Sequence, residues 1–114
     1  MIVHIYTGED GQSHFEDMPL PSALDERCRA RLPLQSATSI EFIQFPGDFF
    51  SDWHPASCRM YAIILSGKVE CKIGDGTVRR FGPGDVMFEE DVTGQGHSNR
   101  ALDGQPVLVA FVRT

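Results

Sequence analysis

The sequence predicts an all-β protein, and three observations support that prediction. Short runs rich in β-branched and aromatic residues recur along the chain, and clusters of glycine, proline and aspartate separate them. One of these runs, Val69–Ile73, alternates apolar and charged residues with the period of two that marks a half-buried strand. No segment shows a convincing helical period. Together these features are typical of a β-barrel or β-sandwich.

Length and charge narrow the class of protein further. The 114 residues are enough for one core, and no linker or repeat divides them, so we predict a single domain over residues 1–114. Ten basic and sixteen acidic residues give a net charge of −6 without a basic run, which argues against binding to nucleic acid or an anionic membrane.

Neither end of the chain nor its interior carries an obvious membrane or export signal. No apolar run approaches the roughly 18 residues of a transmembrane helix, and Met1–Asp10 lacks a basic segment followed by an apolar one. We therefore expect no membrane partner and a cytoplasmic location. The three cysteines are widely spaced without a CxxC pattern, so we interpret them as reduced thiols that pack as small hydrophobic groups.

The N-terminal part, residues 1–32, holds the first predicted strands. Ile2–Thr7 is rich in β-branched and aromatic residues, and Ser13–Phe15 could begin a second short strand. Pro19 and Pro21 exclude a central strand after it. Ser22–Arg31 is the one place where a helix could lie, but its alternating end favours a loop or strand.

The remaining strands form a core that we place at about residues 38–112. Ser36–Phe45 has apolar residues at positions 40, 42, 43 and 45, so its alternation slips by one step. That slip predicts a bulge or a strand that is buried on both faces. The other predicted strands are Tyr61–Leu65 and Val69–Ile73, which form a hairpin, followed by Thr77–Phe81, Val86–Phe88 and Val107–Val112.

Two stretches of this core each contain one histidine between turn residues. The first, Trp53–Gly67, reads WHPASCRMYAIILSG and contains His54. The second, Phe81–Asn99, reads FGPGDVMFEEDVTGQGHSN and contains His97. We predict that the two stretches bring these histidines together inside one small barrel.

These stretches resemble the two motifs of the cupin superfamily, over roughly residues 38–112. Gly67 occupies the position of the glycine that ends the first motif, and His54 occupies its first histidine position. In the second motif Gly94 and His97 keep the Gly-x2-His spacing, while Asn99 follows two residues later instead of four. The resemblance implies a double-stranded β-helix, or jelly-roll barrel. It is most specific to small bacterial single-domain cupins, most of which have no assigned activity.

The resemblance also implies which side chains enter the barrel. Metal-binding cupins hold a divalent ion with three histidines and a glutamate, but here Ala56 and Met60 fall at two of those four positions. A catalytic metal generally needs about three protein ligands. We therefore expect an apolar pocket without a metal more than a metal site. The predicted pocket residues are Trp53, Ala56, Cys58, Met60 and Phe88, in addition to His54 and His97.

Three roles remain open for His54 and His97. They could bind a small molecule or act as catalytic acid and base. They could be metal ligands, with His14, Cys58 or Met60 completing the site around a soft ion. They could also be purely structural, satisfied by backbone partners.

Charged residues near these histidines have two interpretations as well. The three acids Glu89–Asp91 are either a solvated loop, which we favour, or a site in which Glu89 supports His97 at the pocket mouth. Arg59 and Arg100 either pair outward with acids or receive a carboxylate substrate.

The sequence thus predicts a small-molecule-binding cupin of unassigned activity, with a metal-dependent dioxygenase or isomerase as the alternative. Cupins often pair their sheets, and the N-terminal strand looks like an edge strand. We therefore also expect a homodimer.

Overall fold

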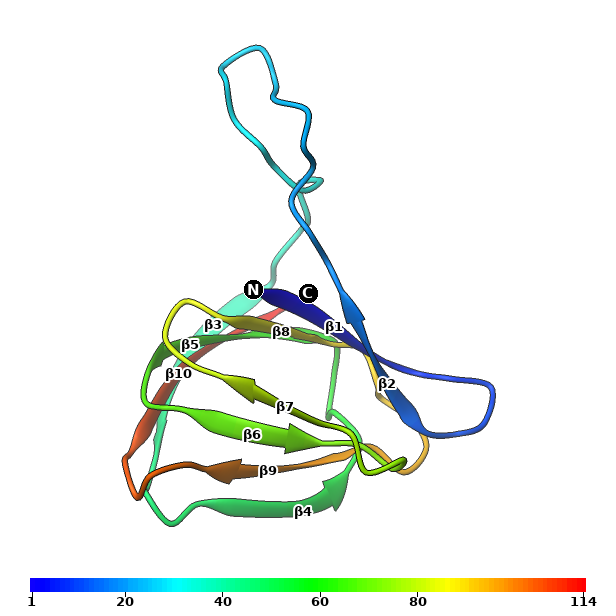
Figure 1. Cartoon of the computed structure of the whole chain (residues 1–114), viewed down its shortest axis with the longest axis vertical. Helices are drawn as coiled ribbons and strands as arrows, with labels where there is room; N and C mark the ends of the chain where they lie inside the picture. Colours follow the sequence, from blue (N-terminus) through cyan, green and yellow to red (C-terminus); the bar gives the residue numbers. More distant parts are fainter.

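The computed structural model describes all 114 residues, and it is all-β with two sheets that face each other (Figure 1). The six-stranded sheet has the order β2-β1-β8-β5-β10-β3, and the four-stranded sheet has the order β4-β9-β6-β7. The all-β prediction is confirmed. The strands are β1 (Ile2–Thr7), β2 (Ser13–Asp17), β3 (Ser39–Phe45), β4 (Phe50–His54), β5 (Met60–Ser66), β6 (Val69–Lys72), β7 (Val78–Phe81), β8 (Val86–Glu89), β9 (His97–Ala101) and β10 (Val107–Arg113).

Most strands lie where the pattern of β-branched and aromatic residues predicts them. Two were missed, β4 and β9, because FSDWH and HSNRA are mostly polar. No helix forms at Ser22–Arg31, which has no regular structure. The structure contains nothing that could serve as a membrane-spanning helix.

The slip in alternation along β3 does not come from a bulge. The register between β3 and β10 runs without a break from Ser39 to Phe45. Ile43 and Phe45 are partly buried, whereas Ile40 and Phe42 on the alternate positions are exposed. The strand is therefore regular, and both of its faces carry apolar side chains.

The core fills the space between the two sheets. Alternation along each strand turns one set of apolar side chains inward. Full burial of a valine, isoleucine, phenylalanine or methionine side chain stabilises the fold by about 1.5–3 kcal/mol. The central cluster contains Val3, Ile5, Ala62, Ile64, Val69, Cys71, Phe81, Met87, Val107 and Val109. Cys71 is buried, as expected for a thiol that packs as a small hydrophobic group, but Cys58 is only partly buried and Cys28 is exposed, so the prediction is wrong for Cys28.

Residues 18–38 form an arm that projects away from the sheets (Figure 1). The arm leaves β2 and returns into β3, which are the two edge strands of the six-stranded sheet. It has no strand and no buried residue.

Candidate functional site

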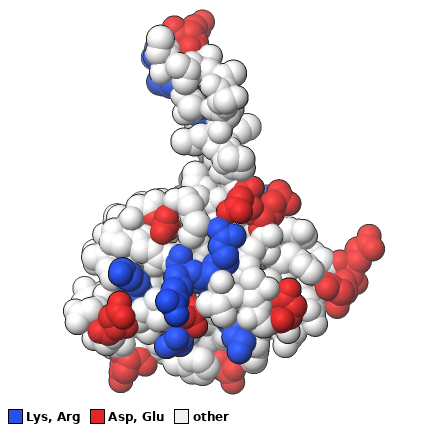
Figure 2. Space-filling model, in the orientation of Figure 1, with Lys and Arg blue, Asp and Glu red and all other residues white.

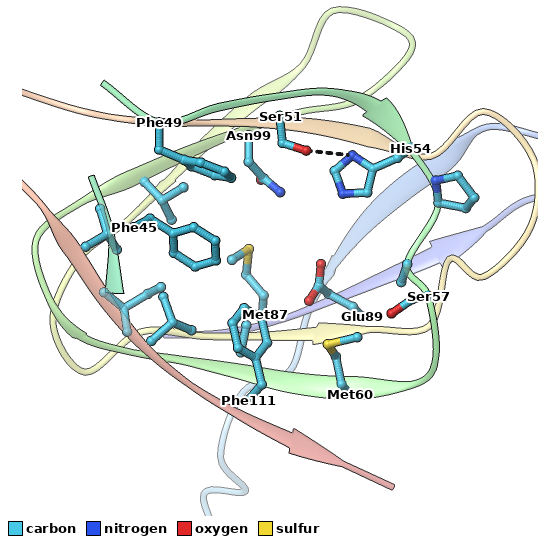
Figure 3. Close-up of a pocket in the computed structure, with 17 residues that line it drawn as sticks. Phe45, Phe49, Ser51, His54, Ser57, Met60, Met87, Glu89, Asn99 and Phe111 are labelled. Carbon is cyan, nitrogen blue, oxygen red and sulfur yellow. Dashed lines mark hydrogen bonds between the residues drawn. The ribbon is translucent and has the colours of Figure 1, made fainter. Parts of the chain in front are cut away.

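A cavity of about 370 Å³ lies between the two sheets (Figure 3). Seventeen residues line it, and eleven of them are hydrophobic, so most of its wall is apolar. The eleven are Phe45, Phe49, Ala56, Met60, Ala62, Ile64, Val69, Met87, Val107, Val109 and Phe111, and the ring of Pro55 also lines the cavity.

The polar side chains of the lining gather at one end. Figure 3 shows His54 and Glu89 directed into the cavity, with Ser51 and Asn99 on the β4–β9 side. Phe45 and Phe49 lie toward the other end (Figure 3). The cavity is therefore suited to a molecule that is apolar over most of its length and polar at one end.

His54 and His97 meet because β4 and β9 pair antiparallel. The two residues are partners in the register, and their ring centroids are 4.8 Å apart. Gly96 makes the approach possible, since a Cβ on it would lie 1.9 Å from the carbonyl oxygen of His54. Gly96 also has a φ of 76°, which favours glycine. The sequence prediction that the two motifs bring these histidines together agrees with this geometry.

Hydrogen bonding orients the ring of His54. Its Nδ1–H donates to the carbonyl oxygen of Asp52 at 2.6 Å, and Ser51 Oγ lies 3.1 Å from the same nitrogen. Because Nδ1 carries the hydrogen, Nε2 of the neutral ring is a hydrogen-bond acceptor. Figure 3 shows this second nitrogen facing the cavity.

His97 is fully buried behind this wall, and carboxylates lie against both of its nitrogens. Nδ1 hydrogen-bonds Asp91 Oδ2 at 2.6 Å, and Ser13 Oγ donates to the same oxygen at 2.6 Å. Nε2 is 3.1 Å from Glu89 Oε1, although this contact lacks the direction of a hydrogen bond.

The protonation of His97 follows from these neighbours. Burial by itself lowers the pKa of His97, but the hydrogen bond to Asp91 and the charges of Glu89 and Asp91 outweigh it and raise the pKa from 6.5 to about 9. At neutral pH His97 is therefore a buried cation between two acids.

Glu89 and Asp91 correct the prediction of a solvated acidic loop. Both are buried, and Glu89 belongs to β8, where it lies opposite Met60 in β5. Alternation along β8 places Met87 and Glu89 inward, and that signal was present in the sequence. Only Glu90 turns outward, where it pairs with Arg59 and His4. Arg100 also points outward and pairs with Glu70.

Two of the predicted pocket residues, Ala56 and Met60, line the cavity together with His54. Cys58, Trp53 and Phe88 do not line it, and this part of the prediction is wrong. Cys58 lies in the irregular segment 55–59, where Pro55 interrupts the strand and its alternation.

Trp53 and Phe88 lie outside the cavity because they are on the outer faces of the two sheets. Trp53 is half exposed in a separate hollow on the outer side of the four-stranded sheet. Phe88 alternates with Glu89, so it lies on the outer face of the six-stranded sheet, stacked on Tyr61 with 4.3 Å between centroids.

The side chains at this site do not fit the metal that the cupin resemblance implies. No group of three or more His, Cys, Asp and Glu side chains is arranged to hold an ion. His97 is engaged by acids at both nitrogens, and His14 pairs with Asp10 in an exposed position outside the cavity lining.

No family model matches the chain, and no curated protein matches its sequence. The site itself offers an apolar chamber, two hydrogen-bond acceptors at one end, and a buried cation that balances the acid at its wall.

Proposed function

We propose that this chain is a small cupin-type jelly-roll protein whose pocket binds a small molecule with an apolar body and a hydrogen-bond-donating head group. The observation that carries the proposal is that Glu89 and His54 both face the cavity at one end, while most of the remaining lining is apolar. The cupin assignment is supported by the two facing sheets and by the His54–His97 pair between the two motif strands.

The head group follows from the two atoms that it would meet. The carboxylate of Glu89 accepts hydrogen bonds, and so does Nε2 of neutral His54. Two acidic side chains, Glu89 and Asp91, and one cation, His97, lie at this end of the site, so acidic groups are in excess. A phenol, an alcohol or an amine satisfies such a site, whereas a carboxylate ligand would be repelled.

A second candidate function is acid–base catalysis without a metal, and the contact of Glu89 with His97 favours it. Oε1 of Glu89 is 3.1 Å from Nε2 of His97, and Glu89 also lines the cavity. Glu89 can then accept a proton from the head group or from a neighbouring carbon of the bound molecule. Nε2 of His54, which faces the same end of the cavity, can accept a second proton.

Three probes with the same apolar body test the proposal: 2-naphthol, 2-naphthylmethylamine and 2-naphthoate. Isothermal titration calorimetry should show that the phenol and the amine bind, and that the carboxylate binds at least tenfold more weakly. Glu89→Gln should abolish the preference for the amine over the carboxylate. Glu16→Gln, at an exposed position on β2, is the matched control and should leave the preference unchanged.

Two outcomes would contradict the proposal. Equal affinity for all three probes would show that Glu89 and His54 do not select the head group. Binding that persists in Ala62→Leu, which narrows the cavity, would place the probes elsewhere. Metal analysis of protein purified without chelator is the companion measurement, and a near-stoichiometric ion that is lost in His54→Ala/His97→Ala would favour the metal-dependent alternative.

A further inference from the structure

The outer face of the six-stranded sheet carries two apolar rows that run across neighbouring strands. Strand register aligns Ile40 with Val112 and Tyr61, and it aligns Phe42 with Ala110 and Ile63. Ile40 is 60% exposed and Phe42 is 63% exposed, both on the edge strand β3. A soluble chain rarely leaves an apolar surface of this kind without a partner.

The arm, residues 18–38, likewise leaves apolar side chains uncovered. It exposes Leu20, Leu24 and Leu34, and Leu34 is 95% exposed. Figure 2 shows that most of the surface of the arm is neither acidic nor basic. A segment of this length without regular structure is uncommon inside a compact domain, unless it has a function of its own.

The arm nevertheless has a defined local structure. Asp25 accepts hydrogen bonds from the backbone N–H groups of Arg27 and Arg29 and from the Arg29 side chain. Tyr61 on the outer face donates to Gln35 at 2.6 Å, which ties the base of the arm to the edge of the apolar rows. The arm is thus held in a shape that points away from its own sheet (Figure 1).

Charge distinguishes the arm from the rest of the chain. Three arginines and two acidic residues lie within residues 18–38, so the arm is weakly basic, while the whole chain has a net charge of −6. Electrostatic attraction therefore favours association of the weakly basic arm of one copy with the acidic remainder of a second copy.

We propose that the occupant of the outer face is the arm of a second copy of this chain, in a reciprocal, two-fold symmetric dimer. Each protomer presents one arm and one apolar face, so both surfaces are covered when two copies meet. The arrangement also explains the sequence of β3, whose apolar residues on both faces predict a strand buried on both sides.

The experiment compares the mass of full-length protein with that of two kinds of variant, by size-exclusion chromatography with light scattering. The proposal predicts a dimer, twice the 12.7 kDa of the chain. Phe42→Lys, on the face, and the triple variant Leu20→Glu/Leu24→Glu/Leu34→Glu, on the arm, should each be monomeric. Thermal unfolding should show that both variants remain folded, because all four side chains are exposed.

Phe50→Lys is the matched control for the face. Phe50 is 62% exposed but lies on β4, in the other sheet, so its replacement should leave the dimer intact.

A monomeric wild-type protein would overturn the proposal, as would an arm that folds back on its own sheet. A dimer that Phe42→Lys dissociates and the arm variant does not would show direct packing of two faces without the arm. A dimer that only Phe50→Lys dissociates, or that no variant affects, would place the interface elsewhere.

Discussion

Glu89 on β8 lies directly opposite Met60 on β5, and both side chains line the cavity. The cupin resemblance places a ligand glutamate at the position of Met60. Here a carboxylate enters the same region from the neighbouring strand and faces a buried, protonated histidine. Glu89 therefore has a charged partner within the protein.

Removal of the charge of Asp91 should destabilise the fold strongly. Asp91→Asn keeps the size of the side chain but leaves His97 with one of its two acids, in a place that water does not reach. Loss of one partner of a buried ion pair typically costs about 3–5 kcal/mol. Urea unfolding measures this change, and Asp48→Asn, at an exposed position, is the control that should change the free energy of unfolding little. Equal stabilities of the two variants would show that the buried network contributes nothing.

The stability of the protein should also fall as pH rises from about 6.5 to 9. The pKa of His97 is about 9 in the folded chain and 6.5 in the unfolded one, so the folded state holds its proton more tightly. The stabilisation is complete below pH 6.5 and is lost as pH rises through 9, with a total of up to about 3 kcal/mol. Urea unfolding at several pH values measures the slope. His97→Gln should be less stable and should lack that slope, whereas an unchanged slope would assign it to other groups.

Gly96→Ala should disrupt the meeting of the two histidines. The added Cβ would lie 1.9 Å from the carbonyl oxygen of His54, so β4 and β9 would have to separate. Gly76→Ala is the matched control, because Gly76 has a similar positive φ and no atom within 4 Å of the added Cβ. The control should lose about 1–2 kcal/mol from backbone strain alone. We expect a clearly larger loss for Gly96→Ala, together with weaker binding of 2-naphthol, and equal losses would show that the contact is not tight.

Local pattern predicted most of the strands but only part of the site. Val69–Lys72 and Val107–Arg113 follow from alternation or from a run of apolar residues, which are properties of one strand. Alternation also places Glu89 inward once β8 is known. Cys58 was placed wrongly, because the pattern was continued through Pro55, where the strand stops.

The part that sequence did not predict depends on pairing between distant segments. That His97 lies between Glu89 and Asp91, and that Ser13 reaches Asp91 from 78 residues away, follows from how β1, β2 and β8 assemble. No local period encodes such contacts. The projecting arm was likewise not predicted, because a segment with three prolines and mixed charge only excludes regular structure.

The motif alignment itself can be tested by restoring the two positions at which the chain departs from metal-binding cupins. The variant Ala56→His/Met60→Glu adds an imidazole and a carboxylate to the cavity wall beside His54. If the alignment is right, these groups and His54 converge on one point, and the variant should bind Mn²⁺ or Ni²⁺ more tightly than the wild type does.

Isothermal titration calorimetry with the two ions measures the gain, and His54→Ala in the same background is the control that should remove it. The cavity of about 370 Å³ has room for the larger side chains, so circular dichroism should show a folded variant. A folded variant without metal affinity would mean that positions 56 and 60 do not occupy the ligand positions of the cupin motif.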